Sequence, residues 1–125
     1  MFAAVCAAVS PSALSKIIAD SLPGVASVSP EISTCTFTSA TNAKLRLVVS
    51  IRHIPNSQLE AAKQGLRDNA SEDISIGDIS RYSKAFDGDL VSVIKGNSQL
   101  LVFWHGGTLT RDVIIEIAKV VLSQM

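Results

Sequence analysis

The amino-acid sequence predicts an α+β fold, in which helices pack on an antiparallel sheet of about five strands. Two observations lead to this expectation. Short runs of alternating apolar residues follow one another with only turn residues between them, and short turns imply antiparallel pairing. Other stretches repeat their apolar residues at helical spacing. The expected order of elements is α-β-β-α-β-β-β-α, within a single domain of residues 1–125.

The strand predictions centre on residues 89–105. Two β-rich runs flank Gly96-Asn97-Ser98 there, and a glycine permits the positive φ of a tight hairpin. Residues 44–52 form the clearest single strand, because Leu45, Leu47, Val49 and Ile51 alternate with polar or charged residues. Further strands are expected at 33–39 and 80–86, the second joined to the hairpin through Asp87-Gly88.

Three helices are expected to cover this sheet. The first opens at Ser10-Pro11 and runs to Pro23-Gly24, with a stripe of Leu14, Ile17, Ile18 and Leu22. The second follows Pro55-Asn56 and is only weakly apolar, so we place it over an edge of the core. The third begins after Gly106-Gly107, with Thr108 or Thr110 as its cap, and has the widest apolar stripe.

Composition narrows the functional classes. Eleven basic residues balance eleven acidic ones with no long run of either sign, which argues against a nucleic-acid partner. No apolar run approaches the roughly 20 residues of a membrane span. The apolar start at residues 1–9 lacks the basic residues of a secretion signal and leads directly into the first helix. We therefore take Cys6 as a residue of the domain and expect any leader peptide to lie outside the sequence given.

The residues that most often carry chemistry are sparse. His53 and His105 are the only histidines, and no metal-binding spacing of histidine and cysteine accompanies them. We predict no metal and no cofactor; the alternative is a chance site completed by Asp73 or Asp78. His105-Gly106-Gly107 is similar to the oxyanion-hole motif of lipases, but the nucleophile motif Gly-x-Ser-x-Gly is absent. A small hydrolase that uses His105 is thus the least favoured alternative, and we predict that the protein is not an enzyme.

The hairpin has a second apolar side that something must shelter. Leu100, Val102 and Trp104 alternate with Leu101 and Phe103, so both sides of this strand are apolar. Together with Val48, the Trp104 side could line a ligand groove or a subunit interface. The alternative is that a helix covers it as ordinary core.

Several short motifs occur in an order that resembles a known family. They are Cys6 ahead of a helix opened by Ser-Pro, Cys35 within Thr-Cys-Thr-Phe-Thr, Gly77-Asp78, the run Val-Ile-Lys-Gly-Asn followed by Leu-Leu-Val, and a closing Ile-Ala-Lys-Val-Val helix. Over most of its length the chain resembles the DUF3558-like extracytoplasmic lipoprotein domains of bacteria. The resemblance implies a disulfide between the two cysteines, a location in the cell envelope and a role without catalysis. No lipid-attachment motif precedes Cys6.

The cysteines also support a cross-link on physical grounds. A disulfide that ties the N-terminus of a small domain to a strand would remove unfolded-chain entropy equivalent to roughly 3–4 kcal/mol. Two buried free thiols in a cytosolic protein are the alternative. The sequence therefore predicts an extracytoplasmic, non-enzymatic domain that binds a partner protein or a small apolar ligand. A self-associating homodimer is the alternative function.

Overall fold

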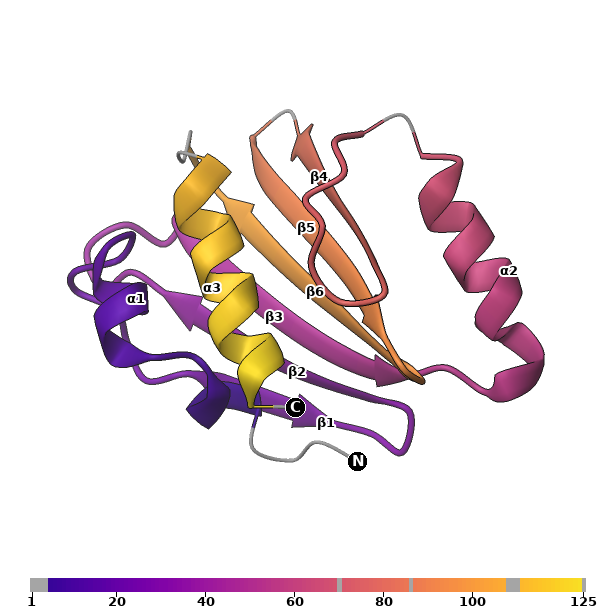
Figure 1. Ribbon diagram of the computed structural model, residues 1–125. Helices are drawn as coiled ribbons and strands as arrows, with labels where there is room; N and C mark the ends of the chain where they lie inside the picture. Colours follow the sequence, from indigo (N-terminus) through magenta and orange to yellow (C-terminus); the bar gives the residue numbers. More distant parts are fainter. Residues whose placement is uncertain (1–4, 70, 86, 108–110, 125) are drawn as a thin grey trace.

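The computed structural model describes residues 5–69, 71–85, 87–107 and 111–124. Its centre is a six-stranded antiparallel sheet with the strand order β1-β2-β3-β6-β5-β4 (Figure 1). The strands are β1 Val25–Val28, β2 Ile32–Thr38, β3 Arg46–His53, β4 Ile79–Ala85, β5 Gly88–Lys95 and β6 Ser98–His105. The helical segments are η1 Val5–Ala8, α1 Pro11–Ser15, α2 Asn56–Arg67 and α3 Arg111–Ser123. The predicted α+β class and antiparallel pairing are confirmed.

The predicted hairpin of β5 and β6 lies in this sheet between β3 and β4. β5 and β6 pair from Lys95↔Ser98 back to Gly88↔His105, and Gly96 in the turn has a φ of +57°. This left-handed backbone is the conformation for which a glycine is favoured. β6 then pairs with β3 along its whole length, so the middle of the sheet is made by strands that are distant in sequence.

The strand count was underestimated by the sequence analysis. Residues 25–28 form β1, an additional strand that pairs with β2 from Val25↔Thr36 to Val28↔Ser33. All of its residues are exposed, and its short sequence Val-Ala-Ser-Val has no run of alternating apolar and polar residues from which a strand could be predicted. This segment is a strand because its backbone pairs with β2, although none of its side chains is buried. The order of elements is therefore η-α-β-β-β-α-β-β-β-α.

The first helix is also shorter than predicted. α1 ends at Ser15, whereas the apolar stripe predicted a helix reaching Leu22. The chain leaves the helix because it pairs with the end of β2 instead: the Leu22 N–H donates to the Thr38 carbonyl, and the Ala40 N–H to the Asp20 carbonyl. The predicted strand end at Phe86 and the predicted caps Thr108 and Thr110 lie outside the described residues.

One face of the sheet carries the main hydrophobic core. The cross-strand pairs Leu47↔Trp104 and Val49↔Val102 lie at its centre, and all four side chains are buried. η1, α1 and α3 pack over this face, with α3 across β5 and β6 (Figure 1). Full burial of one such aliphatic side chain contributes about 1.5–3 kcal/mol to the free energy of unfolding.

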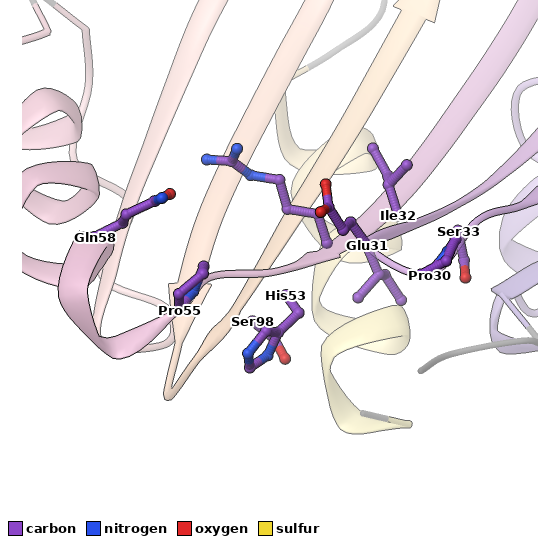
Figure 2. A pocket seen from close by; sticks show the side chains of 10 residues that line it. Pro30, Glu31, Ile32, Ser33, His53, Pro55, Gln58 and Ser98 are labelled. Atoms are coloured by element: carbon purple, nitrogen blue, oxygen red, sulfur yellow. The ribbon is translucent and has the colours of Figure 1, made fainter.

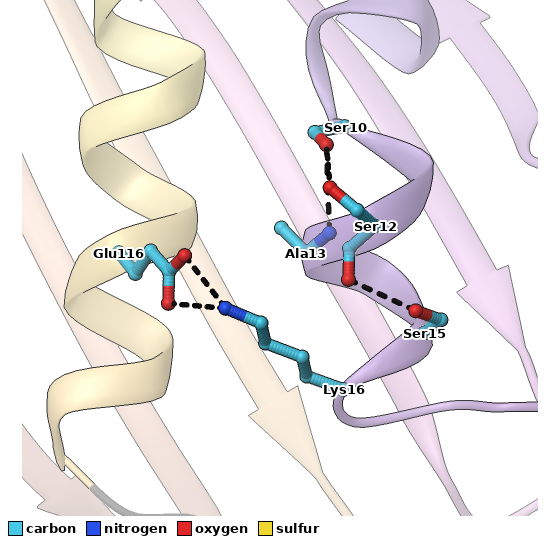
Figure 3. Close-up of polar contacts among 6 residues, drawn as sticks. All are labelled: Ser10, Ser12, Ala13, Ser15, Lys16 and Glu116. Carbon is cyan, nitrogen blue, oxygen red and sulfur yellow. Dashed lines mark hydrogen bonds and ion pairs between the residues drawn. The ribbon is translucent and has the colours of Figure 1, made fainter.

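Polar contacts fix the ends of α1 against this layer. The Ser10 Oγ accepts a hydrogen bond from the Ala13 N–H at 3.4 Å, which caps the first turn. The Lys16 ammonium lies 2.8 and 3.0 Å from the two carboxylate oxygens of Glu116, which joins α1 to α3 (Figure 3). Both side chains are about half exposed, so solvent weakens this ion pair.

A buried polar pair lies between β4 and β5. The Tyr82 hydroxyl donates to the Asp89 carboxylate at 2.5 Å, and Asp89 is fully buried. Burial, followed by the hydrogen bond to this carboxylate, raises the pKa of Tyr82 to about 12. The tyrosine therefore stays neutral, and its hydroxyl continues to donate a hydrogen bond to the Asp89 carboxylate.

A disulfide joins the N-terminal segment to the sheet. The sulfur atoms of Cys6 in η1 and Cys35 in β2 are 2.06 Å apart, with a Cα–Cα distance of 5.2 Å. Gly24 packs against this bond: a Cβ at that position would lie 2.6 Å from the Cys35 sulfur. The cross-link therefore holds both η1 and the start of β1 against β2.

Removing this bond should destabilise the domain strongly. We expect the double variant Cys6→Ala, Cys35→Ala to lose roughly 3–4 kcal/mol of unfolding free energy, because the bond closes a loop over a sequence separation of 29. Urea unfolding monitored by tryptophan fluorescence measures the loss. Wild-type protein reduced in denaturant is the matched control. A loss below about 1 kcal/mol would show that the bond does not restrict the unfolded chain.

The turn before β3 provides a pH-dependent contribution to stability. Hydrogen bonds from Thr41 and then Ser39 lower the pKa of Asp20 below its ordinary value of 3.8. The ionised form therefore stabilises the fold above pH 3.8, and this contribution disappears as the pH falls through the lower folded-state pKa. Asp20→Asn should be less stable than the wild type at neutral pH, with a difference that narrows in acid. A difference in unfolding free energy between Asp20→Asn and the wild type that stays constant as the pH falls would contradict this prediction.

Candidate ligand-binding groove

The second face of the sheet, which we call the open face, is covered differently from the first. It carries the alternate side chains of the strands, and most of them at the centre are only half-buried. These are Thr34 and Thr36 of β2, Val48 and Ser50 of β3, Leu101 and Phe103 of β6, and Leu90 of β5. A single hydrogen-bonded pair, Thr34 and Ser50 at 3.1 Å, crosses this surface between β2 and β3.

α2 is the helix associated with one border of the open face. It contacts β4, and none of its side chains is buried (Figure 1). The Arg81 guanidinium, which points to the open face, donates to the Leu66 and Arg67 carbonyls at 3.0 and 3.3 Å. A cation at a helix C-terminus satisfies carbonyls that have no partner within the helix. At the other end, the Asn97 amide donates to the Ile54 carbonyl at 3.0 Å.

Two isoleucines are buried without belonging to the main core. Ile54, just before the helix, is 2% exposed, and Ile94 of β5 is fully buried. Ile94 points to the open face, and neither residue belongs to the main core cluster. The interactions that fasten α2 to the sheet are its contacts with β4 and the hydrogen bonds at its two ends.

A groove lies where the β1–β2 turn, the end of β3 and the beginning of α2 meet. Its volume is about 780 Å³, within the range of small-molecule sites. Figure 2 shows the lining side chains projecting from these separate segments. They are Pro30, Glu31, Ile32, Ser33, Ile51, Arg52, His53, Pro55, Gln58 and Ser98. The lining therefore combines apolar side chains with a cation, a carboxylate and neutral polar groups.

Arg52 is the best-positioned charged group of the groove. Its Nε donates to the Gln99 Oε1 at 2.9 Å, and the Gln99 Nε2 donates in turn to the Ser92 Oγ at 3.0 Å. Gln99 is buried, so this chain of hydrogen bonds holds the inner side of the guanidinium. Among the described residues, the two terminal nitrogens of Arg52 make no hydrogen bond or ion pair. They are available to an anion, because a guanidinium presents several donors in a fixed fork.

Glu31 and His53 form the rim on the opposite side. The His53 N–H donates to the Glu31 carbonyl at 3.0 Å, which fixes the turn between β1 and β2 relative to β3. Both side chains are exposed. The Glu31 carboxylate forms no ion pair within the part of the chain that the structure describes, so it remains a second charge at the mouth. The groove is thus suited to a ligand with an apolar body and an acidic group directed toward Arg52.

The residues named by the sequence do not form one surface. Leu100 and Val102 are fully buried and Trp104 is 3% exposed, so a helix-covered core encloses all three. Val48 pairs with Phe103 and points to the open face, away from Trp104. The groove was not predicted, because the sequence places Arg52 among the polar residues on the solvent side of the 44–52 strand, where a solvated face is favoured over an anion-binding patch. The available signal was Gln99, a polar residue within an otherwise apolar strand.

The histidines lie at opposite ends of the central strands. His105 pairs with Arg46, and His53 with Ser98, which separates them by about 23 Å along β3. The His105 ring stacks on Phe103 with ring centres 3.9 Å apart, and its Nδ1 lies 3.9 Å from the Asp87 carboxylate. Within the described residues, no three histidine, cysteine or acidic side chains gather as a metal site would require.

Comparison with known proteins identified no relative of this chain. A scan against protein-family models, a search of curated proteins and a search of solved structures each found no match. None of the helices among the described residues has the length and apolar character needed to cross a membrane.

Proposed function

We propose that this protein is a non-enzymatic, extracytoplasmic binding domain whose groove takes a small apolar ligand carrying an acidic group. The observation that carries the proposal is the Arg52 guanidinium, which Gln99 holds from one side and which lines a groove of about 780 Å³. Ile32, Pro30 and Pro55 supply the apolar lining. A side chain of the same chemistry on a partner protein would use the same contacts.

The extracytoplasmic location is supported by the cross-link. Disulfides persist in oxidising compartments and are rare in the cytosol, and the only two cysteines of this chain are joined. The motifs shared with DUF3558-like envelope domains favour the same location. Both arguments are independent of the groove.

Binding without catalysis is favoured by the geometry of the polar groups. His53 and Ser98 are cross-strand neighbours in the groove, and they are the residue types of a base and its nucleophile. No hydrogen bond joins the Ser98 hydroxyl to the His53 ring, and no carboxylate lies within ion-pairing distance of that ring in the described structure. An activated nucleophile requires such a chain of contacts. We therefore assign these residues to the polar lining of the groove.

Binding of 8-anilinonaphthalene-1-sulfonate tests this proposal, because the dye combines an apolar body with a single anionic group. We expect saturable fluorescence enhancement that Arg52→Gln weakens by roughly tenfold in affinity, the equivalent of about 1.4 kcal/mol. Ile32→Ser should weaken binding as well, through lost apolar contact. Isothermal titration at several salt concentrations separates the contribution of the Arg52 charge from that of the Ile32 apolar contact, since salt screens only the charge.

Lys44→Gln is the matched control, because it removes an exposed positive charge next to the other end of β3. It should leave the dye affinity unchanged. Equal weakening by the Arg52 and Lys44 variants would show that only net charge matters and would contradict a site at the groove. Turnover of nitrophenyl esters by the wild type that is lost in Ser98→Ala would contradict the non-enzymatic assignment.

A further inference from the structure

The outer edge of β1 is the most exposed apolar part of the described structure. Val25 is 70% exposed and Val28 47% exposed, and Leu22 and Ile32 beside them are 49% and 38% exposed. These are the exposed large apolar residues of the described chain, and they cluster around one short strand. β1 pairs only with β2, so its other side is a strand edge (Figure 1).

The direction of the free backbone groups follows from the register. The Ser29 N–H donates to the Ile32 carbonyl at 2.9 Å, so the backbone of Ser29 faces β2. Alternate residues of an antiparallel strand face the same partner, which places Ser27 and Val25 toward β2 as well. Ala26 and Val28 therefore direct their N–H and C=O groups to the open edge. No described segment pairs with them.

The two edges of the sheet differ in how they are protected. At the β4 edge, Glu72 and Tyr82 exchange two backbone hydrogen bonds, at 3.0 and 2.8 Å, so a neighbouring segment already occupies part of that edge. The exposed Lys84 adds a charge there. Charged residues and covering segments are the usual means by which proteins prevent edge pairing. At β1, no segment of the described residues pairs with the outer edge, and residues 21–30 contain no charged side chain.

We infer that two copies of this chain associate through antiparallel pairing of their β1 strands. A two-fold axis at Ser27 places Ala26 opposite Val28 of the second copy and makes four backbone hydrogen bonds, two for each such pair. The uncharged strand meets itself without like-charge repulsion. A head-to-tail contact of β1 with β4 is disfavoured because the Glu72 segment occupies the β4 edge. The assembly therefore closes as a dimer with one continuous sheet.

The edge is held in place before association. Cys35 pairs with Ala26, and the disulfide to Cys6 fixes this part of β2, while Gly24 packs against the sulfur atoms. Little ordering is then required when a second strand docks, which favours binding. A four-residue strand nevertheless makes a small interface, of the size at which association is transient.

Cross-linking through Ser27 tests both the partner and the register. In the inferred dimer the two Ser27 residues face each other as a non-hydrogen-bonded pair, with Cα atoms about 4.5 Å apart, a distance that a disulfide spans. Ser27→Cys should form a covalent dimer under oxidised glutathione. Ser83→Cys on β4, at the opposite edge of the sheet, is the matched control. It should form at least tenfold less covalent dimer than Ser27→Cys. Adding Val28→Lys to Ser27→Cys should suppress the cross-link by a similar factor.

Sedimentation of the wild type from about 1 μM to about 1 mM covers the range expected for a transient interface. A concentration-dependent dimer that Val28→Lys abolishes supports the inference. A protein that stays monomeric throughout, or equal cross-linking of the Ser27 and Ser83 variants, overturns it. Arg52→Gln, which lies on β3, should weaken dye binding and leave the Ser27→Cys cross-link unchanged, so this inference and the proposed function are tested separately.

Discussion

The pairing of β3 with β6 is the interaction on which the rest of the structure depends. Leu47 meets Trp104 and Val49 meets Val102 on one face, and these pairs join two halves of the chain that are about fifty residues apart. Each half adds its remaining strands outward from this centre, β2 and β1 on one side and β5 and β4 on the other. Because the central strands bury their apolar side chains on the same face, a shift of register by one residue would expose all of them.

The helices are insufficient to enclose both faces of so wide a sheet. η1, α1 and α3 cover the face of Trp104, while α2 contacts β4 and, at its first residue, the Asn97 side chain in the β5–β6 turn. The open face consequently keeps a row of threonine, serine and half-buried apolar side chains. A polar chain from Ser92 through Gln99 to Arg52 crosses it and ends at the groove. The incomplete cover thus leaves a charged side chain both supported and accessible.

The sequence was sufficient for those elements that have a clear local pattern. β3 and α3 were predicted because apolar residues recur at a fixed period, and β5 and β6 because β-rich runs flank a turn that contains glycine. The paired cysteines were predicted from their number and setting. β1 was missed because its stability comes from pairing with β2, which no local pattern records. The groove was missed for a related reason: Ile32, Arg52 and Gln58 come from three elements, and only the completed topology brings them together. Trp104 was considered as a surface residue because the sequence does not say which side of β6 a helix covers.

The β1–β2 hairpin links the cross-link, the groove and the free edge. Its turn contributes Pro30 and Glu31 to the groove, while Val25 and Val28 form the exposed edge a few residues earlier. The disulfide anchors this hairpin through Cys35, and the bond from the His53 N–H to the Glu31 carbonyl anchors its turn. Movement of the hairpin would therefore change the groove wall and the edge together. A cross-link at this position restrains both surfaces with a single bond, which explains why a strand with no buried side chain of its own can hold a fixed place in the sheet.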